Sequence, residues 1–235
     1  MKPYVICHMV SSIDGKIWGS RWRPRANVIP NLFEKLHDKL VGQLGGGSWL
    51  CGRVTAQEFA KGTAYPPSDQ VFPREPWFAQ RSAKAWGIFL DGKGKAVWAR
   101  KDIGGDPILV ILTEAVPDRH LAGLRADGVS YIFAGAREID LAVALETLNR
   151  ELGIEHLLLE GGGGANGALL RAGLVDEISL VISPVIDGST GAPNVFNSGN
   201  ADLGPAPIES MTLASHEVLD GGAVWLRYRL SSAVS

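Results

Sequence analysis

The sequence predicts an α/β fold with a mainly parallel central sheet and antiparallel C-terminal strands. Strand-like apolar runs alternate with amphipathic helical patterns over most of the chain, as in parallel sheets covered by helices. One glycine-rich stretch, 156–170, is typical of a strand, a tight turn and the start of a helix. After Asp176 the runs are strand-like only, and Asp220-Gly221-Gly222 is typical of a hairpin turn.

The N-terminal elements begin with a buried strand at 4–10. A turn at 11–17 follows and carries Asp14 at its tip. The segment 20–30 is rich in arginine and contains Trp22, so we expect an irregular stretch over a cleft. Apolar residues at helical spacing predict a helix over 32–43, with Asn31 as its cap and Gly45–Gly47 at its end.

The next part pairs short elements with a long loop. A strand at 48–51 leads through the turn Gly52-Arg53-Val54-Thr55 into a short helix at 56–60. The segment 61–85, rich in proline and aromatic residues, is too long for an ordinary connection. Such segments are lids, binding loops or packed surface insertions, and the sequence leaves these interpretations open.

The remaining pattern completes the α/β alternation. Strands are predicted at 86–90, 108–112 and 129–133, with helices at 120–125 and 138–152. The C-terminal strands are predicted at 177–185, 209–219 and 223–230. Because no linker or repeat divides the chain, we expect one domain over 1–235.

Composition narrows the class of protein. The chain has 235 residues, a net charge of −2 and 46% hydrophobic residues, and no apolar run reaches the length of a membrane span. We therefore expect no nucleic-acid partner, no membrane partner and a small-molecule substrate. Cys7 and Cys51 lie in apolar runs and predict buried free thiols in a reducing compartment, so we expect a cytoplasmic protein.

Two glycine turns, Gly52–Thr55 and Gly161–Gly164, each lead from a strand into a helix. The free amides of a helix start favour a phosphate, and glycines let a ligand approach the backbone. Arg53 adds a forked cation and Thr55 a hydroxyl. Two such anion sites suit a dinucleotide with an extra phosphate, which favours NADP over NAD. A tight turn without a ligand is the alternative.

A dinucleotide fingerprint of the Rossmann type competes with this interpretation. Gly162, Gly164 and Gly167 have its spacing, and Asp187 follows after an apolar run. Against it, no further strand–helix–strand unit follows Asp187. The scattered histidines and the absence of a C-x-x-C pattern make a metal site unexpected.

Two carboxylates, Asp14 and Glu160, are predicted at strand ends that face the same cleft. A carboxylate in that position can hold a ribose or pyrimidine group or supply a proton. Asp14 is equally compatible with a simple turn residue.

The motifs Ser12-Ile-Asp-Gly-Lys-Ile17, Gly52-Arg53-x-Thr55 and Leu159-Glu-Gly-Gly-Gly163 occur in this order, with Ser20-x-Trp22 after the first. With Asn166–Leu170 and Gly173–Glu177, they resemble the reductase domain of the riboflavin-pathway deaminase-reductase. That family is similar in fold to dihydrofolate reductase, with three layers. The resemblance covers most of the chain.

The resemblance implies NADPH-dependent reduction of a ribosylaminopyrimidine 5′-phosphate to a ribityl chain, as in 5-amino-6-(5-phosphoribosylamino)uracil reductases, by a homodimer. It implies catalytic roles for Asp14 and Glu160, and substrate binding by Ser12, Asp14, Ser20 and Glu160. The cofactor-binding residues that it implies are Ser11, Trp22, Gly52, Arg53, Thr55, Gly161, Gly162, Gly163 and Gly164.

One departure bears on the substrate. Bifunctional family members carry Asp-Asp-Pro-x-Leu just after the threonine that matches Thr55, whereas this chain reads Ala56-Gln57-Glu58-Phe59-Ala60. Two alternatives therefore stay open: a dihydrofolate-reductase-like enzyme acting on another pterin or pyrimidine, and a dinucleotide-binding homologue without turnover.

Overall fold

The computed structural model describes residues 1–44, 47–197 and 204–232, which fall into two compact units. The first unit comprises Met1–Pro3 and Gly46–Leu157, and the second comprises Tyr4–Gly45 and Leu158–Ser235. Strand β7 (His156–Leu159) carries the chain from the first unit into the second. The single-domain organisation expected from the sequence stays a prediction.

The sheet of the first unit is parallel apart from one short strand. Parallel pairs join β2 to β3, β3 to β5 and β5 to β6, whose bounds are Trp49–Gly52, Gly87–Leu90, Asp106–Leu112 and Ser130–Phe133. The two-residue strand β4 (Asp102–Ile103), which the sequence pattern missed, pairs antiparallel with β5. Residues 108–112 of β5 are fully buried, so this strand forms the centre of the core.

Three helices accompany this sheet. Helix α2 (Arg53–Phe59) contacts β2 and β3, while α3 (Asp118–Asp127) and α4 (Leu141–Leu152) contact β6. Asp140 caps α4, its side chain accepting a 3.0 Å hydrogen bond from the Val143 amide. The alternation of strands and helices is therefore confirmed here.

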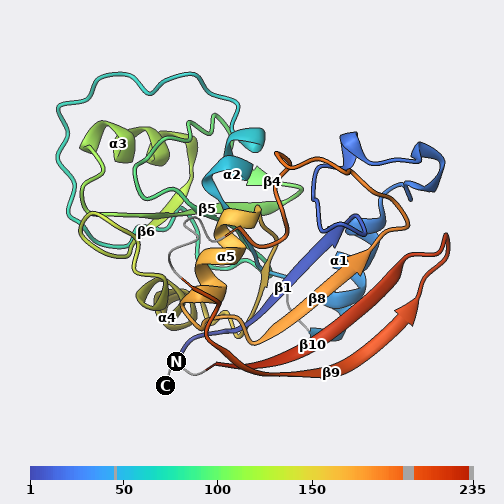
Figure 1. Ribbon diagram of the computed structural model, residues 1–235. Coiled ribbons are helices and arrows are strands. Elements are labelled where there is room, and N and C mark those ends of the chain that lie inside the picture. Colours follow the sequence, from blue (N-terminus) through green and yellow to red (C-terminus); the bar gives the residue numbers. More distant parts are fainter. Residues whose placement is uncertain (45–46, 198–203, 233–235) are drawn as a thin grey trace. The chain divides into compact units, whose positions relative to one another are not determined.

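The segment 61–85, the teal trace around α3 in Figure 1, packs against the first unit at several points. The Tyr65 hydroxyl donates to Asp127 at 2.8 Å, and Trp77 and Tyr131 exchange backbone hydrogen bonds of 2.9 Å. The Arg125 guanidinium lies over the rings of Phe72, Trp77 and Tyr131. These contacts favour the packed-insertion interpretation, and a role as a lid stays a prediction.

The second unit combines parallel and antiparallel pairing. Strand β1 (Tyr4–Ser11) pairs parallel with β8 (Glu177–Ile182), and β10 (Val224–Ser232) pairs antiparallel with both β8 and β9 (Ile208–Val218). Figure 1 shows β1, β8, β10 and β9 side by side in this order. The predicted antiparallel C-terminal strands are thus confirmed.

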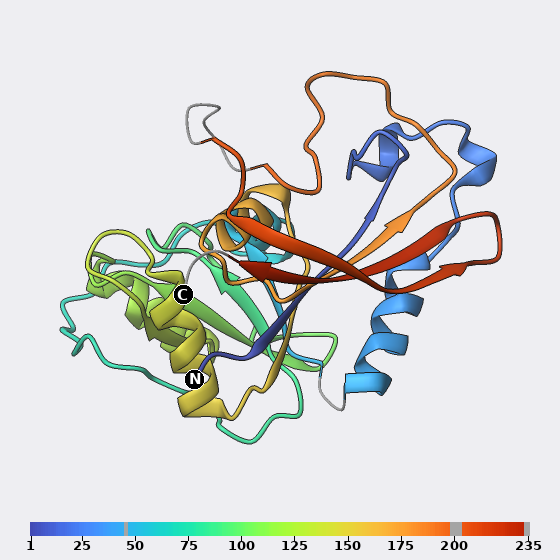
Figure 2. The same ribbon diagram turned by 60° about the horizontal axis from the view of Figure 1, so that its bottom comes forward.

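Helix α1 (Leu32–Leu44) packs along β1 in the second unit, as Figure 2 shows. Leu36 and Leu40 are buried on its inner face, and the Phe33 ring stacks on His8 with centroids 5.1 Å apart. The irregular segment before α1 contains two short 3₁₀ helices, Gly19–Arg21 and Arg25–Asn27. The second unit also contains α5 (Gly163–Arg171).

Several predicted boundaries were wrong. Helix α2 begins at Arg53, so Arg53 and Thr55 lie within its first turn and not before it. The cause is Gly52, which is the N-cap in extended conformation, together with burial of Ala56 against the sheet. Helix α4 begins at Leu141 and strand β8 ends at Ile182. The expected helix-ending glycines 45 and 46 lie outside the described residues.

Two further points concern the class of protein. Cys7 and Cys51 are both buried, as predicted, and neither is joined in a disulfide within the described residues. Within the described ranges, none of the helices has the length and apolar character that crossing a membrane requires.

Candidate active site

The glycine turn between β7 and α5 is tightly fitted to its own unit. Gly161 has a φ of +95°, a conformation that side chains rarely adopt. A Cβ atom at Gly163 would overlap the carbonyl oxygen of Asn194, whereas one at Gly164 would meet nothing within 4 Å. A side chain at position 164 would therefore find open space, whereas position 163 has no room for one.

The first turn of α5 begins with backbone amides that have no partner in the preceding turn of the helix. The intrahelical bonds begin at the amides of Ala165 and Asn166, which donate to the Gly162 carbonyl at 2.9 and 3.2 Å. Amides that precede the first intrahelical bonds are the ones a helix offers to an anion, and the helix dipole adds to the attraction. The turn is thus suited to a phosphate group.

Residues 193–197, here called the bridging segment, tie this helix start to the turn at 12–17. The Asn197 amide donates to the Gly163 carbonyl at 2.8 Å, and Asn166 Nδ2 donates to the Val195 carbonyl at 2.8 Å. On its other side, Lys16 Nζ donates to Asn194 Oδ1 at 2.7 Å. The glycine turn and the Asp14 turn, far apart in the sequence, are therefore parts of one cluster in the second unit.

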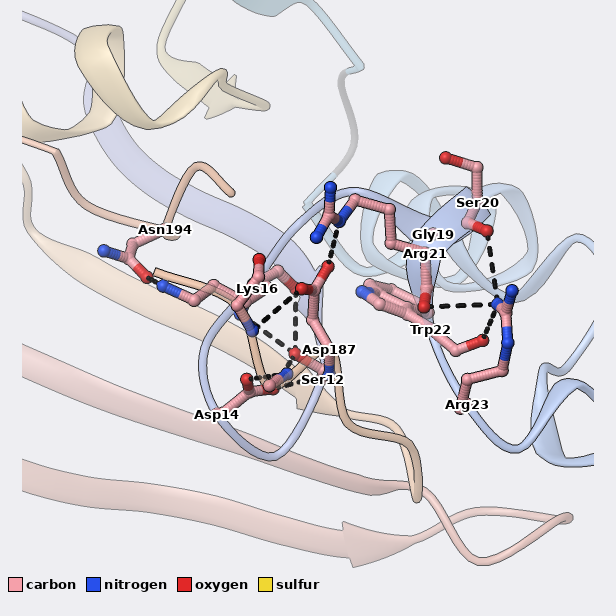
Figure 3. A network of polar contacts seen from close by, with 12 residues as sticks. Ser12, Asp14, Lys16, Gly19, Ser20, Arg21, Trp22, Arg23, Asp187 and Asn194 are labelled. Atoms are coloured by element: carbon pink, nitrogen blue, oxygen red, sulfur yellow. Dashed lines mark hydrogen bonds and ion pairs between the residues drawn. The ribbon is translucent and has the colours of Figure 1, made fainter. Parts of the chain in front are cut away.

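Asp14 is the centre of a polar network in that cluster (Figure 3). One carboxylate oxygen accepts from Ser12 Oγ at 2.6 Å and from the Asp187 amide at 3.1 Å, and the other accepts from the Gly188 amide at 2.8 Å. The Ser12 hydroxyl above all, then the two amides, lower the pKa of Asp14 to about 2. Asp14 is therefore an ionised carboxylate that joins its own turn to the loop at 187–188 by hydrogen bonds. This favours the interpretation as a turn residue, which the sequence had left open.

The arginine-rich segment lies beside this network in Figure 3 and folds largely on itself. Arg23 Nη1 donates to the Trp22 carbonyl at 2.9 Å, and Arg21 pairs with Asp187 at 2.9 Å. Ser20 is exposed on the first 3₁₀ turn. The Trp22 side chain is buried, and its indole N–H has no acceptor among the described residues. Ser11, the last residue of β1, is buried.

Glu160 precedes the glycine turn and is bound by a residue that the sequence analysis did not single out. His37 Nδ1 on α1 lies 2.6 Å from Glu160 Oε1, and the Glu160 side chain is only 8% exposed. From the sequence, each histidine is most simply a surface or core residue. His37 lies one turn after Phe33, which stacks on His8 of β1, and no local sequence pattern sets it apart.

The other predicted anion site lies in the first unit. Gly52 pairs in register with Leu90, so Arg53 and Asp91 leave the same end of the parallel pair β2–β3. Arg53 Nη1 donates to Gln57 one helical turn later at 3.1 Å, and Thr55 lies in the same turn. Burial raises the pKa of Asp91, opposed by the Ala96 and Lys95 amides and by the Arg53 charge.

The structure thus groups the predicted residues by unit. The second unit holds Ser11, Ser12, Asp14, Ser20, Trp22, Glu160 and Gly161–Gly164, and the first holds Gly52, Arg53 and Thr55. The Rossmann alternative does not fit, because α5 leads into β8 and then into antiparallel strands. Its candidate acid, Asp187, is paired with Arg21.

Three curated relatives carry one name, 2,5-diamino-6-ribosylamino-4(3H)-pyrimidinone 5′-phosphate reductase. The chain is 36% identical to the Methanothermobacter thermautotrophicus protein over 96 residues, 41% of this chain and 44% of that one. It is 24% identical to the Archaeoglobus fulgidus protein over 97% of this chain and 99% of that one. The match to the first relative therefore spans less than half of its length.

Solved structures share the fold. A pyrimidine reductase-like protein from Corynebacterium diphtheriae superposes with a TM-score of 0.68 at 21% identity, covering 97% of this chain and 92% of that one. A riboflavin biosynthesis reductase from Saccharomyces cerevisiae gives a TM-score of 0.59 at 16% identity, covering 98% and 90%. The predicted fold class is therefore confirmed.

Residues 95–225 match the sequence profile described as the RibD C-terminal domain. The matched range includes β5, both α3 and α4, the glycine turn and most of the C-terminal strands. Since it spans more than half of the sequence, the resemblance found in the motifs is confirmed, and the chain belongs to the RibD C-terminal domain family.

Proposed function

We propose that the chain is a reductase of 2,5-diamino-6-ribosylamino-4(3H)-pyrimidinone 5′-phosphate in riboflavin biosynthesis. The observation that carries the proposal is the alignment with the A. fulgidus reductase of that name over 97% of this chain and 99% of that protein. The name shared by these three curated relatives favours this diamino substrate over the uracil expected from the bifunctional enzymes.

We propose NADPH as the cofactor, and the second unit fits a dinucleotide phosphate. The start of α5 has the backbone amides that a helix offers to an anion, and a Cβ atom at Gly164 would meet open space. The buried Trp22 indole N–H lacks an acceptor within the described chain. When bound, NADPH supplies the hydride that reduces the ribosyl carbon. In the proposal, Gly161–Gly164 hold the pyrophosphate, and Ser11 and Trp22 line the cofactor.

The substrate side of the proposal rests on the cluster around Glu160 and Asp14. A carboxylate accepts hydrogen bonds from N–H and O–H groups of an aminopyrimidine or its sugar. Glu160 is proposed to orient the substrate directly. Asp14 and Ser12 keep their proposed substrate role mainly through the loop geometry that they hold, and Ser20 offers an exposed hydroxyl.

The decisive experiment follows NADPH absorbance with purified protein and three candidate substrates. These are the diamino pyrimidinone phosphate, its deaminated uracil counterpart and dihydrofolate. We expect oxidation with the first and much slower oxidation with the others. Turnover of dihydrofolate alone would favour the reductase of another pterin, and NADPH binding without any turnover would favour the non-catalytic homologue.

A separate prediction concerns Arg53, Gly52 and Thr55, proposed here as cofactor-binding residues of the first unit. If Arg53 contacts the 2′-phosphate, Arg53→Ala should weaken NADPH binding by about 1.5–3 kcal/mol and NADH binding far less, because one charge-assisted bond is lost. Fluorescence titration with both cofactors measures this. Gln57→Ala is the matched control, since it removes only the helical partner of Arg53. Equal losses for both cofactors would assign Arg53 elsewhere.

We also propose a homodimer that uses the face of β9 carrying Met211 and Leu213. Met211 and Leu213, which alternate onto one face, are 49% and 47% exposed, and β9 ends the strand order of the sheet in the described chain. Leu213→Glu should convert the dimer to a monomer in light scattering, whereas Thr212→Glu on the other face should not. A wild-type monomer would contradict the proposal.

The cytoplasmic location expected from the sequence stays a proposal as well.

A further inference from the structure

We infer that His37 is a positioning residue that fixes the Glu160 carboxylate for the substrate. This inference rests on the proposed function and adds to it a residue outside all the motifs that led to that function. Its basis is the contact between α1 and the residue just before the glycine turn, both within the second unit.

The contact is short and largely shielded from water. His37 Nδ1 and Glu160 Oε1 are 2.6 Å apart, with side chains 23% and 8% exposed. With Glu160 ionised, the Nδ1 proton of His37 is the donor in this bond, because an ionised carboxylate only accepts hydrogen bonds. A nearly buried carboxylate without such a donor would carry a large desolvation cost.

The donor itself sits on a rigid support. Leu36 and Leu40 anchor α1 in the core, and Phe33, one turn before His37, stacks on His8 of β1. His8 in turn bonds to Ser179 of β8 through Nδ1 at 3.0 Å. The imidazole of His37 is thus placed by packing of a helix on two paired strands and not by a mobile loop.

The bond to His37 sets the orientation of the Glu160 carboxylate. A carboxylate group is planar, so fixing Oε1 against His37 also fixes the direction in which Oε2 accepts a hydrogen bond. Glu160 is followed at once by Gly161, whose positive φ sets the turn. A bond to α1 therefore holds the side chain while the turn holds the backbone, which is the preorganisation that precise substrate orientation requires.

The test is a double-mutant cycle on the full chain with His37→Ala, Glu160→Gln and both. We expect His37→Ala to lower kcat/KM for the diamino pyrimidinone phosphate about tenfold to hundredfold, as for loss of a charge-assisted supporting bond, with NADPH affinity unchanged. In the Glu160→Gln background, the same substitution should have almost no further effect. His37→Gln, which keeps a donor, should restore much of the activity.

Asp38→Ala is the matched control, because Asp38 is exposed on the next position of α1. Equal losses from His37→Ala in both backgrounds, or no loss in the wild-type background, would overturn the inference. A readout independent of turnover is the NMR signal of the His37 Nδ1 proton. It should be protected from exchange in the wild type and displaced in Glu160→Gln; an unchanged signal also overturns the inference. Absence of wild-type turnover, by contrast, contradicts the proposed function and leaves the NMR result to decide on His37.

Discussion

Gly163→Ala should destabilise the protein and abolish tight NADPH binding. The added methyl group would overlap the Asn194 carbonyl oxygen, and it would lie 3.3 Å from the Asn197 Cβ atom. The neighbour that must move is backbone, and its segment is held by hydrogen bonds from Asn197 to Gly163 and from Asn166 to Val195. Overpacking of this kind costs about 1–3 kcal/mol of unfolding free energy, which denaturant titration measures.

Gly164→Ala is the control for this prediction, because a Cβ atom there meets nothing within 4 Å. In a helix, alanine is favoured over glycine by roughly 0.5–1 kcal/mol, so this variant should be at least as stable as the wild type. If the cofactor pyrophosphate lies against α5, the variant should nevertheless bind NADPH more weakly. Stability of Gly163→Ala equal to that of Gly164→Ala would contradict the fit of Gly163 to the bridging segment.

The two substitutions show what the sequence could and could not predict at the glycine turn. A strand, a glycine turn and a helix follow from local pattern, because each depends on neighbouring residues. The structural reason for each individual glycine does not follow from local pattern. Gly163 is required by a carbonyl of the bridging segment, which is remote in sequence, and Gly161 by its own positive φ. A run of glycines therefore reflects packing as well as ligand binding.

Helix α2 illustrates a different limit. Val54 and Thr55 are β-branched and come just after Gly52-Arg53, so local propensity favours a turn before the helix. In the structure Gly52 caps the helix and the fully buried Ala56 packs toward β2 and β3. Tertiary burial overrides a propensity difference of a few tenths of a kcal/mol, and boundaries move accordingly.

The candidate site also contains residues that the sequence pattern predicts and one that it does not. Asp14 and Glu160 were found from their places at strand ends, whereas His37 lies 123 residues from its partner in sequence. A single histidine on an amphipathic helix has no local pattern that distinguishes a functional contact from a surface position. Only the packing of α1 on β1 brings it to Glu160.

Glu160→Gln should lower turnover with little change in NADPH affinity. Glutamine keeps the size of the side chain, but the charge is lost and one carboxylate oxygen is replaced by an N–H donor. If Glu160 accepts a hydrogen bond from the substrate or transfers a proton, kcat/KM should fall about 10²–10⁴-fold. Steady-state kinetics and NADPH titration on the same preparation separate the two effects.

The carboxylate control is Glu155→Gln, which removes an exposed charge just before β7 and should leave the kinetics unchanged. Glu160→Asp tests position separately from charge, because it keeps the charge but moves the carboxylate away from His37 by one methylene group. Its activity should fall between those of the wild type and Glu160→Gln if position and charge both matter. An unchanged rate in Glu160→Gln would remove the residue from the site, and a parallel loss of NADPH affinity would assign it to the cofactor.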